Sequence, residues 1–340
     1  MIKGNLKKIL NIVIILLITC LVLYFSLKDN FKDIINQILD INIFWLILAF
    51  ILLFIYWILR SLAMHTFIKM VKPSAKYFNS LLLTLRTQFV NAITPFATGG
   101  QPYQIYYLKK NDIGISKSTS IIVENFIVYQ IALVSLGLIA LFSNRIFHIF
   151  NKNELLAHLV AIGFFMNTLV IVLLFILSFG KKLNKTLINI GITVLTKLRI
   201  VKDRDKQLSK WDEKIKNFHE CASILLKNKK KFIKTIIYNF IALIALYLIP
   251  LIVLFSFGDY NSVNGFEVII TSAYVMLIGS FVPIPGGSGG LEYGFVAFYG
   301  NFISGSLLSA VMLIWRFITY YFGMIIGAIA FYIKRVKECE

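Results

Sequence analysis

Two proline- and glycine-rich stretches hold the residue types of this sequence that are best suited to bind a charged group. Residues 94–103 read TPFATGGQPY, and residues 280–293 read SFVPIPGGSGGLEY. Both contain P-x-x-x-G-G-x-x-Y, and the shared positions lie 190 residues apart: Pro95, Gly99, Gly100 and Tyr103, then Pro285, Gly289, Gly290 and Tyr293. Glycine lets two backbones approach closely, and a helix that begins behind such a turn directs its amino terminus at an anion such as phosphate.

These glycines do not form a nucleotide-binding loop. GGSGG lacks the Lys-Ser/Thr of a P-loop, and no soluble βαβ pattern follows it. The three cysteines have no pair spacing, and the four histidines are scattered along the chain. The sequence therefore predicts no metal site, no disulfide framework and no bound cofactor.

The composition places both stretches in a membrane protein. Of the 340 residues, 58% are hydrophobic and only 15% are charged, whereas soluble domains are about 45–50% apolar and about 25% charged. The net charge of +19 is concentrated in a few loops, so cytoplasmic loops and anionic lipids explain it better than nucleic acid does. We expect no nucleic-acid partner.

A few charged residues fall inside the apolar segments, namely Arg60, Arg86, Glu124, Glu292 and Arg316. A charge inside a span is costly, and it usually faces a partner or a wet cavity. The arginines could neutralise a lipid phosphate, or Arg316 could pair with Glu292 or Glu124 as a structural link. Arg60 lies near a helix end, where we favour snorkelling of its side chain to the membrane surface.

Hydropathy predicts the elements that position these residues. Six segments are long enough to cross the membrane, at about 8–27, 43–68, 117–143, 155–180, 233–257 and 306–333. Two further pairs of apolar segments are too short, 77–93 with 102–110 and 267–282 with 291–302. Each pair flanks one glycine-rich stretch, so we predict an all-α polytopic membrane protein with six transmembrane helices and two re-entrant helical hairpins.

The distribution of Lys and Arg predicts the topology. Basic residues flank the first hairpin on both sides, whereas 258–266 and 301–305, which flank the second, have none. Segment 181–234 has sixteen. Under the positive-inside rule, the first hairpin enters from the cytoplasm and the second from outside. We expect a multi-pass protein of the plasma membrane with both termini in the cytoplasm.

The basic segment 181–234 contains a predicted amphipathic helix at 205–231. Its apolar residues recur at helical spacing: Leu208, Trp211, Ile215, Phe218, Ala222 and Leu225. Two interpretations remain open. The helix could lie on the membrane surface, or it could be a linker helix that packs on the bundle.

The two halves of the chain look like copies of one unit. Repeat 1 covers about 8–143 and repeat 2 about 155–333, and each half has the order helix, helix, hairpin, helix in opposite orientation. Inverted repeats of this kind are typical of transporters. We therefore treat residues 1–340 as one membrane domain.

Three motifs resemble a known family. NAITPFATGGQPYQIYYLKK at 91–110, VPIPGGSGGLE at 282–292 and WRFITYY at 315–321 resemble the membrane domain of the lysylphosphatidylglycerol synthase/flippase family. That domain forms the amino-terminal part of the multiple peptide resistance factor, and it also occurs as a stand-alone protein. The resemblance implies a flippase-like fold with a lipid-sized cavity.

In two-part members of this family, a cytosolic carboxy-terminal domain transfers lysine from lysyl-tRNA to phosphatidylglycerol, and the membrane domain carries the product outward. This chain ends seven residues after its last predicted span, so we expect it to lack the transferase domain. The residues that match the motifs are Gly99, Gly100, Gln101, Pro102, Pro283, Pro285, Gly286, Gly287, Gly289, Glu292, Arg316 and Tyr320.

The sequence thus favours a flippase that moves a phospholipid, aminoacyl-phospholipid or glycolipid between the two hairpins. An alternative is a lipid-modifying enzyme, although Glu124 and Glu292 have no His or Cys beside them. Another is a partner subunit of a separate lipid synthase; an oligomer is compatible with each. The predicted substrate-binding residues are Arg86, Pro95, Gly99, Gly100, Gln101, Tyr103, Glu124, Pro283, Pro285, Gly286, Gly287, Gly289, Gly290, Glu292, Tyr293, Arg316 and Tyr320.

Overall fold

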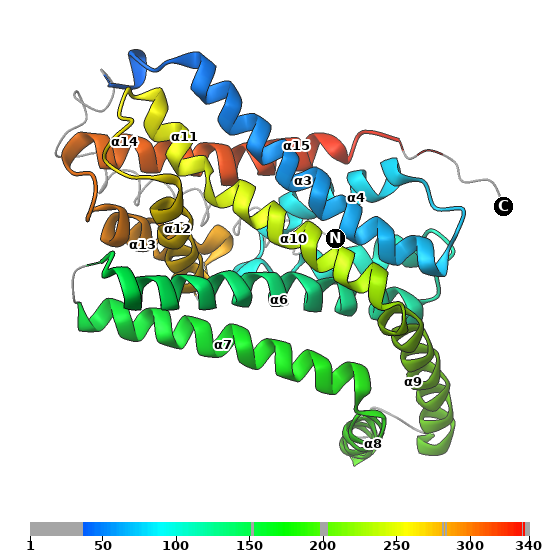
Figure 1. The fold of residues 1–340 in the computed structure, drawn as a ribbon. Coiled ribbons are helices and arrows are strands. Elements are labelled where there is room, and N and C mark those ends of the chain that lie inside the picture. The colour runs from blue at the N-terminus through cyan, green and yellow to red at the C-terminus, as the bar shows by residue number, and fades with distance from the viewer. Residues whose placement is uncertain are drawn as a thin grey trace.

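The computed structural model of the protein describes residues 37–150, 153–197, 203–280, 282, 284–334 and 336. All regular secondary structure in these ranges is helical (Figure 1). Among these residues, five helical segments are long and apolar enough to cross a membrane. They are α3 (Ile43–Val71), α6 (Ile115–Phe147), α7 (Glu154–Phe179), Lys229–Ser256 and Gly305–Ala330. Five of the six predicted spans are thus confirmed, and the predicted span 8–27 lies outside the described residues.

Two of these spans are not continuous α-helices: one is interrupted next to a proline and the other by a π-helical turn. Lys229–Ser256 consists of α10 (Lys229–Tyr247) and α11 (Ile249–Ser256), with Pro250 at the start of α11. Proline is tolerated there because the first helical turn leaves its N–H groups free. Gly305–Ala330 consists of α14 (Gly305–Arg316), a π-helical turn η3 (Phe317–Phe322) and α15 (Gly323–Ala330). Such π-turns often occur at functional sites, and this one begins directly after Arg316.

Each glycine-rich stretch forms the turn of a helical hairpin. The first hairpin consists of α4 (Tyr77–Ala92), η1 (Pro95–Ala97) and α5 (Gly100–Lys109). The second hairpin consists of α12 (Gly265–Gly279), η2 (Pro285–Gly287) and α13 (Gly290–Tyr299). In each hairpin the two helices pack on each other, and the turns η1 and η2 touch.

The turns η1 and η2 share a pair of left-handed residues but use different residue types there. Gly286 and Gly287 have φ angles of 67° and 64°, and Phe96 and Ala97, at the equivalent positions, have 53° and 52°. A residue with a Cβ is strained in this left-handed region by about 1–2 kcal/mol. The first turn therefore keeps the conformation without the residue type that adopts it most easily.

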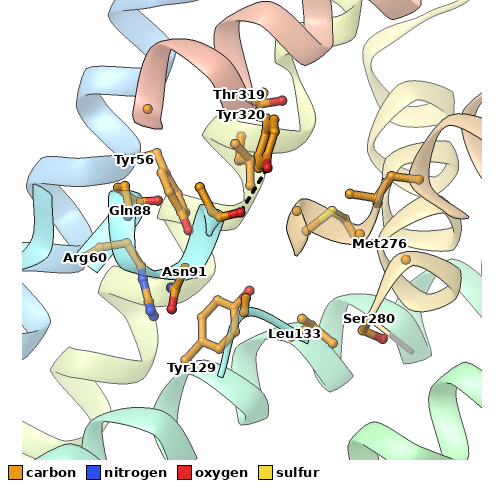
Figure 2. Close-up of a pocket in the computed structure, with 18 of the residues that line it drawn as sticks. Tyr56, Arg60, Gln88, Asn91, Tyr129, Leu133, Met276, Ser280, Thr319 and Tyr320 are labelled. Carbon is orange, nitrogen blue, oxygen red and sulfur yellow. Dashed lines mark hydrogen bonds between the residues drawn. The ribbon is translucent and has the colours of Figure 1, made fainter. Parts of the chain in front are cut away.

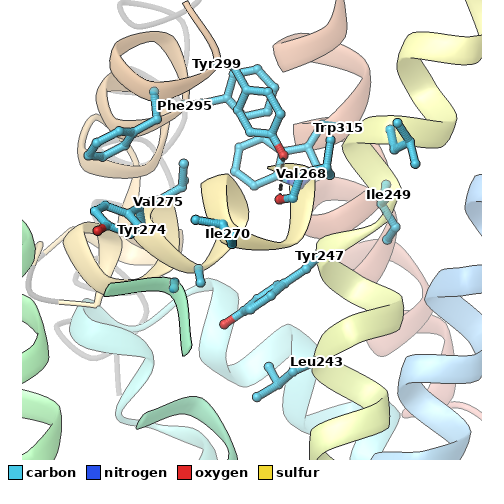
Figure 3. Packing of buried hydrophobic residues seen from close by; sticks show 14 of the residues in the cluster. Leu243, Tyr247, Ile249, Val268, Ile270, Tyr274, Val275, Phe295, Tyr299 and Trp315 are labelled. Atoms are coloured by element: carbon cyan, nitrogen blue, oxygen red, sulfur yellow. Dashed lines mark hydrogen bonds between the residues drawn. The ribbon is translucent and has the colours of Figure 1, made fainter. Parts of the chain in front are cut away.

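The aromatic core fixes α13 between its neighbours (Figure 3). The ring of Phe295 stacks on Tyr299 at 4.2 Å and on Trp315 of α14 at 4.8 Å. The Tyr299 hydroxyl lies 2.8 Å from the Ser272 hydroxyl and 3.4 Å from the carbonyl oxygen of Val268, both on α12. These contacts hold the second hairpin together and against α14.

The basic segment forms α8 (Lys181–Lys197) and α9 (Arg204–Lys227), which lie to one side of the bundle beyond the end of α7 (Figure 1). The second half of α9 buries Phe218, Ala222 and Leu225, and α9 contacts α6 and α8. This half therefore packs on the bundle, as the linker-helix interpretation expects. Trp211, earlier in α9, is 40% exposed.

Helices α4 and α15 pack closely because of Gly327. A Cβ at this position would lie 2.7 Å from the carbonyl oxygen of Leu85 and the amide nitrogen of Phe89, both backbone atoms of α4. Small residues allow such close packing in membranes. Gly323, one turn earlier, would meet only a side-chain carbon of Trp57, at 3.5 Å.

Gly327→Ala is expected to destabilise the fold by about 1–3 kcal/mol, because the two helices must move apart to relieve overpacking. Gly323→Ala is the matched control, and we expect it to be neutral or slightly stabilising because alanine is the better helix former. Thermal unfolding of both purified variants in detergent checks this. Equal unfolding midpoints would contradict it.

Candidate functional site

A cavity of about 730 Å³, lined by both polar and apolar side chains, lies between the two hairpins and the helices α3, α6, α10 and α14 (Figure 2). Helices from both hairpins and from several spans contribute to its walls. The amide side chains that line it are Gln88, Asn91, Gln101, Gln104, Asn125, Gln130 and Asn167. The size is that of ordinary ligand pockets, but the wall is unusually rich in uncharged hydrogen-bonding groups for a bundle of apolar helices.

Arg60 of α3 supplies a positive charge to this cavity. One N–H of its guanidinium group donates to Oδ1 of Asn239 on α10, and the group lies 4.1 Å from the ring centre of Tyr129 on α6. No carboxylate of the described residues forms an ion pair with it. Figure 2 shows the side chain reaching toward Asn91 and Tyr129. Arg60 thus faces the interior of the bundle, contrary to the snorkelling interpretation.

Arg316 and Glu292 form a buried ion pair within the second hairpin region. Nε of Arg316 lies 2.7 Å from Oε1 of Glu292, and both side chains are almost fully buried. The other carboxylate oxygen, Oε2, accepts the backbone N–H of Gly289 at 2.7 Å. Arg316 also donates to the carbonyl oxygen of Gly286 at 3.1 Å. The pair therefore ties α14 to η2 and to the start of α13.

Tyr320 links the two hairpins. Its hydroxyl donates to the carbonyl oxygen of Ala92, the last residue of α4, at 3.0 Å (dashed in Figure 2). The same ring covers η2, because a Cβ on Gly286 would lie 2.2 Å from a carbon of the Tyr320 ring. Glycine is thus required at position 286 by both its positive φ angle and the close approach of this ring.

The backbone amides expected to bind an anion are partly used within the protein. Glu292 accepts the N–H of Gly289 in front of α13, and the hydroxyl oxygen of Thr94 accepts the N–H of Gly99 in front of α5, at 3.1 Å. These two N–H groups are therefore not available to a ligand in this conformation. Of the two arginines that line the cavity, Arg316 is paired with Glu292, and Arg60 has no carboxylate partner among the described residues.

Some of the predicted substrate-binding residues line the cavity, and the others lie outside its lining. The predicted residues that line it are Gln101, Gly286, Gly287, Arg316 and Tyr320. Those outside the lining are Arg86, Pro95, Gly99, Gly100, Tyr103, Glu124, Pro285, Gly289, Gly290, Glu292 and Tyr293. Pro283 lies outside the described residues.

Two predicted residues point elsewhere for clear reasons. Arg86 donates to the carbonyl oxygens of Ala330 and Ile333 at 2.9 and 2.8 Å, where a cation stabilises the carboxyl end of α15. Glu124 is fully buried on α6 beside Ser178 and Cys221, so it faces the junction with α7 and α9. Neither residue contacts the cavity.

Most of the amide side chains of the wall are not among the predicted residues, because inside the apolar segments those were chosen mainly by charge. Asn and Gln residues within apolar helices are the feature of the sequence that could have indicated this wall. Gln88 and Asn91 stand one turn apart near the end of α4, and Asn125 and Gln130 lie in the apolar helix α6. Polar side chains at such positions also require a partner or a cavity.

Fold and cavity together define a polytopic, all-helical membrane protein with a cavity that has several polar side chains in its wall. The chain belongs to the family described as the lysylphosphatidylglycerol synthase transmembrane region, which matches residues 9–327. A UPF0104 membrane protein of Archaeoglobus fulgidus is 24% identical over 301 residues, which is 86% of this chain and 87% of the relative. A UPF0104 membrane protein of Methanocaldococcus jannaschii is 26% identical over 343 aligned residues, 97% of this chain and 95% of the relative.

Proposed function

We propose that this protein transports a lipid by taking its polar headgroup into the cavity while the acyl chains remain in the membrane. The observation that carries the proposal is a cavity of about 730 Å³ in an apolar helical bundle, with seven amide side chains and Arg60 in its wall. A headgroup cannot cross hydrocarbon without losing its hydrogen bonds with water, and an unsatisfied polar group costs several kcal/mol there. The amides and Arg60 would replace those lost interactions.

The hairpins suit this role as re-entrant elements that enter from opposite faces of the membrane. The helices η1, α5 and α6 begin 190 residues before η2, α13 and α14 respectively. This correspondence supports an inverted repeat, in which transport occurs by rocking around a central site. We further propose that the protein lies in the plasma membrane with both termini in the cytoplasm, as the Lys and Arg distribution favours.

The chemistry of the cavity wall favours transport over group transfer. A transferase needs a nucleophile or a general base near its substrate. Among the described residues that line the cavity, none is Asp, Glu, His, Cys or Lys, so the hydroxyl groups of the wall have no such base beside them to activate them as nucleophiles. Glu292, which pairs with the cavity-lining Arg316, also accepts the backbone N–H of Gly289.

Purified protein in vesicles that contain a fluorescent lipid tests the proposal. We expect faster movement of the lipid between leaflets than in protein-free vesicles, measured as the fraction that an impermeant quencher reaches over time. Equal rates in both preparations would contradict transport.

Two substitutions on α6 link this movement to the cavity. Leu133 lines the cavity, whereas Leu138 is 41% exposed on the outside of the bundle. Leu133→Trp should fill the cavity and slow transport by about tenfold or more, the effect of raising a barrier by about 1.4 kcal/mol. Leu138→Trp should transport at the normal rate. Equal rates for the two folded variants would place the lipid path elsewhere.

A further inference from the structure

We propose that the cavity selects a headgroup whose charge is a phosphate and whose remainder is uncharged and rich in hydroxyl groups, and that Arg60 binds the phosphate. This inference rests on the proposed function, because it names the class of lipid that the same site accepts. It also predicts that the site discriminates against headgroups with an added cationic group, such as an aminoacyl ester.

The charge of the cavity wall comes from arginine side chains. Arg60 and Arg316 are the charged residues among the described residues that line the cavity. Arg316 is neutralised by Glu292 at 2.7 Å, which leaves the charge of Arg60 uncompensated among the described residues. A phosphate would restore neutrality, whereas an ammonium group would meet a like charge and find no carboxylate in this wall.

The surroundings of Arg60 leave part of its guanidinium group open to a ligand. A guanidinium group has five N–H donors in a fixed plane, which suits two-pronged binding of phosphate. Asn239 engages Arg60 through NH1, and Tyr129 covers the group at 4.1 Å. Arg60 makes no other hydrogen bond with the described residues. Donors therefore remain for a ligand.

The wall beside Arg60 carries uncharged hydrogen-bonding side chains. Figure 2 shows Tyr56, Gln88 and Tyr129 on the same side of the cavity as Arg60. The side chains of these three residues make no hydrogen bond with the described residues. Phenol and amide groups can both donate and accept, so they suit phosphate oxygens and hydroxyl groups alike. This arrangement matches a phosphate that carries a polyol.

Binding to the purified full-length protein in detergent tests the inference. The probes are short-chain phosphatidylglycerol and lysylphosphatidylglycerol, which differ only by the cationic ester, with glycerol 3-phosphate and inorganic phosphate as free anions. We expect phosphatidylglycerol to bind about tenfold or more tightly than its lysyl ester, a difference of about 1.4 kcal/mol. We expect the free anions to compete only weakly. Equal or tighter binding of the lysyl ester would overturn the inference, and so would equal binding of free phosphate.

Variants then assign the phosphate to Arg60. Arg60→Gln should lose about tenfold or more in affinity for phosphatidylglycerol, because a charged donor is lost. Arg60→Lys should retain part of the affinity, and Arg145→Gln, an exposed arginine at the end of α6, should bind normally. Unchanged affinity of Arg60→Gln would overturn the assignment. If that variant does not fold, Gln88→Leu takes its place, with reduced affinity expected and unchanged affinity contradicting the polar wall.

The transport assay separates this inference from the proposed function. Selective binding of phosphatidylglycerol without lipid movement would refute transport and leave the site intact. Movement of lipids without any headgroup preference would support transport and refute the selective site.

Discussion

Arg316→Ala is expected to destabilise the protein by about 3–5 kcal/mol, because it leaves the buried carboxylate of Glu292 without its partner. Nε of Arg316 lies 2.7 Å from Oε1 of Glu292, and the two side chains are only 5% and 11% exposed. Glu292→Gln should cost a similar amount, because it leaves Arg316 as an unpaired buried charge. Thermal unfolding in detergent measures both effects.

The control for this prediction combines a double variant with an exposed ion pair. Arg316→Met with Glu292→Gln should cost less than the two single substitutions added together, because no buried charge is left without a partner. Lys185 and Asp212 lie 3.0 Å apart with both side chains more than half exposed, so Lys185→Ala should change stability by at most about 1 kcal/mol. A stable Arg316→Ala that only binds lipid less tightly would show that Arg316 acts on the ligand instead.

Gly286→Ala is expected to cost about 2–5 kcal/mol, the second largest effect. The substitution forces alanine into a φ of +67°, at about 1–2 kcal/mol, and places its Cβ 2.2 Å from the Tyr320 ring, where overpacking adds about 1–3 kcal/mol. Because Tyr320 also bonds to Ala92, a displaced ring should loosen the contact between the two hairpins. The unfolding midpoint and the transport rate should therefore both fall.

Gly305 provides the matched control. Its φ is +64°, but a Cβ there would meet nothing within 4 Å. Gly305→Ala should thus cost only the backbone strain of about 1–2 kcal/mol, and the double variant Gly286→Ala with Tyr320→Leu should recover part of the loss. Equal unfolding midpoints for Gly286→Ala and Gly305→Ala would mean that the ring moves aside freely.

Gly289 illustrates how local reasoning and tertiary packing differ. Gly289 and Gly99 hold the same position in the repeated motif, which suggests that a larger side chain there would block the approach of the two hairpin turns. In the structure, a Cβ on Gly289 would meet nothing within 4 Å, and the unusual feature is its φ of +87°. The close approach falls instead on Gly286, three residues earlier, because η3 places Tyr320 there.

Glu292 both caps the start of α13 and pairs with a buried cation. Its position three residues after Gly289 predicts that it can reach back to the start of α13, and its place in an apolar segment predicts a charged partner. Both interactions are present, one on each carboxylate oxygen. The sequence left open whether Arg316 pairs with Glu292 or with Glu124, because that choice depends on how α14 packs on the second hairpin.

The sequence by itself determined the spans, the broken helices and the matching turns. Apolar length and the cost of bare backbone in lipid are local properties, and prolines and glycines mark where a helix ends. Only the tertiary structure decided which polar residues face one cavity. The spans α3, α6 and α7 are apolar on nearly every side, so they have no clear pattern that separates inward from outward faces. Arg60 turned inward and Arg86 and Glu124 turned away because of neighbours that lie far from them in the sequence.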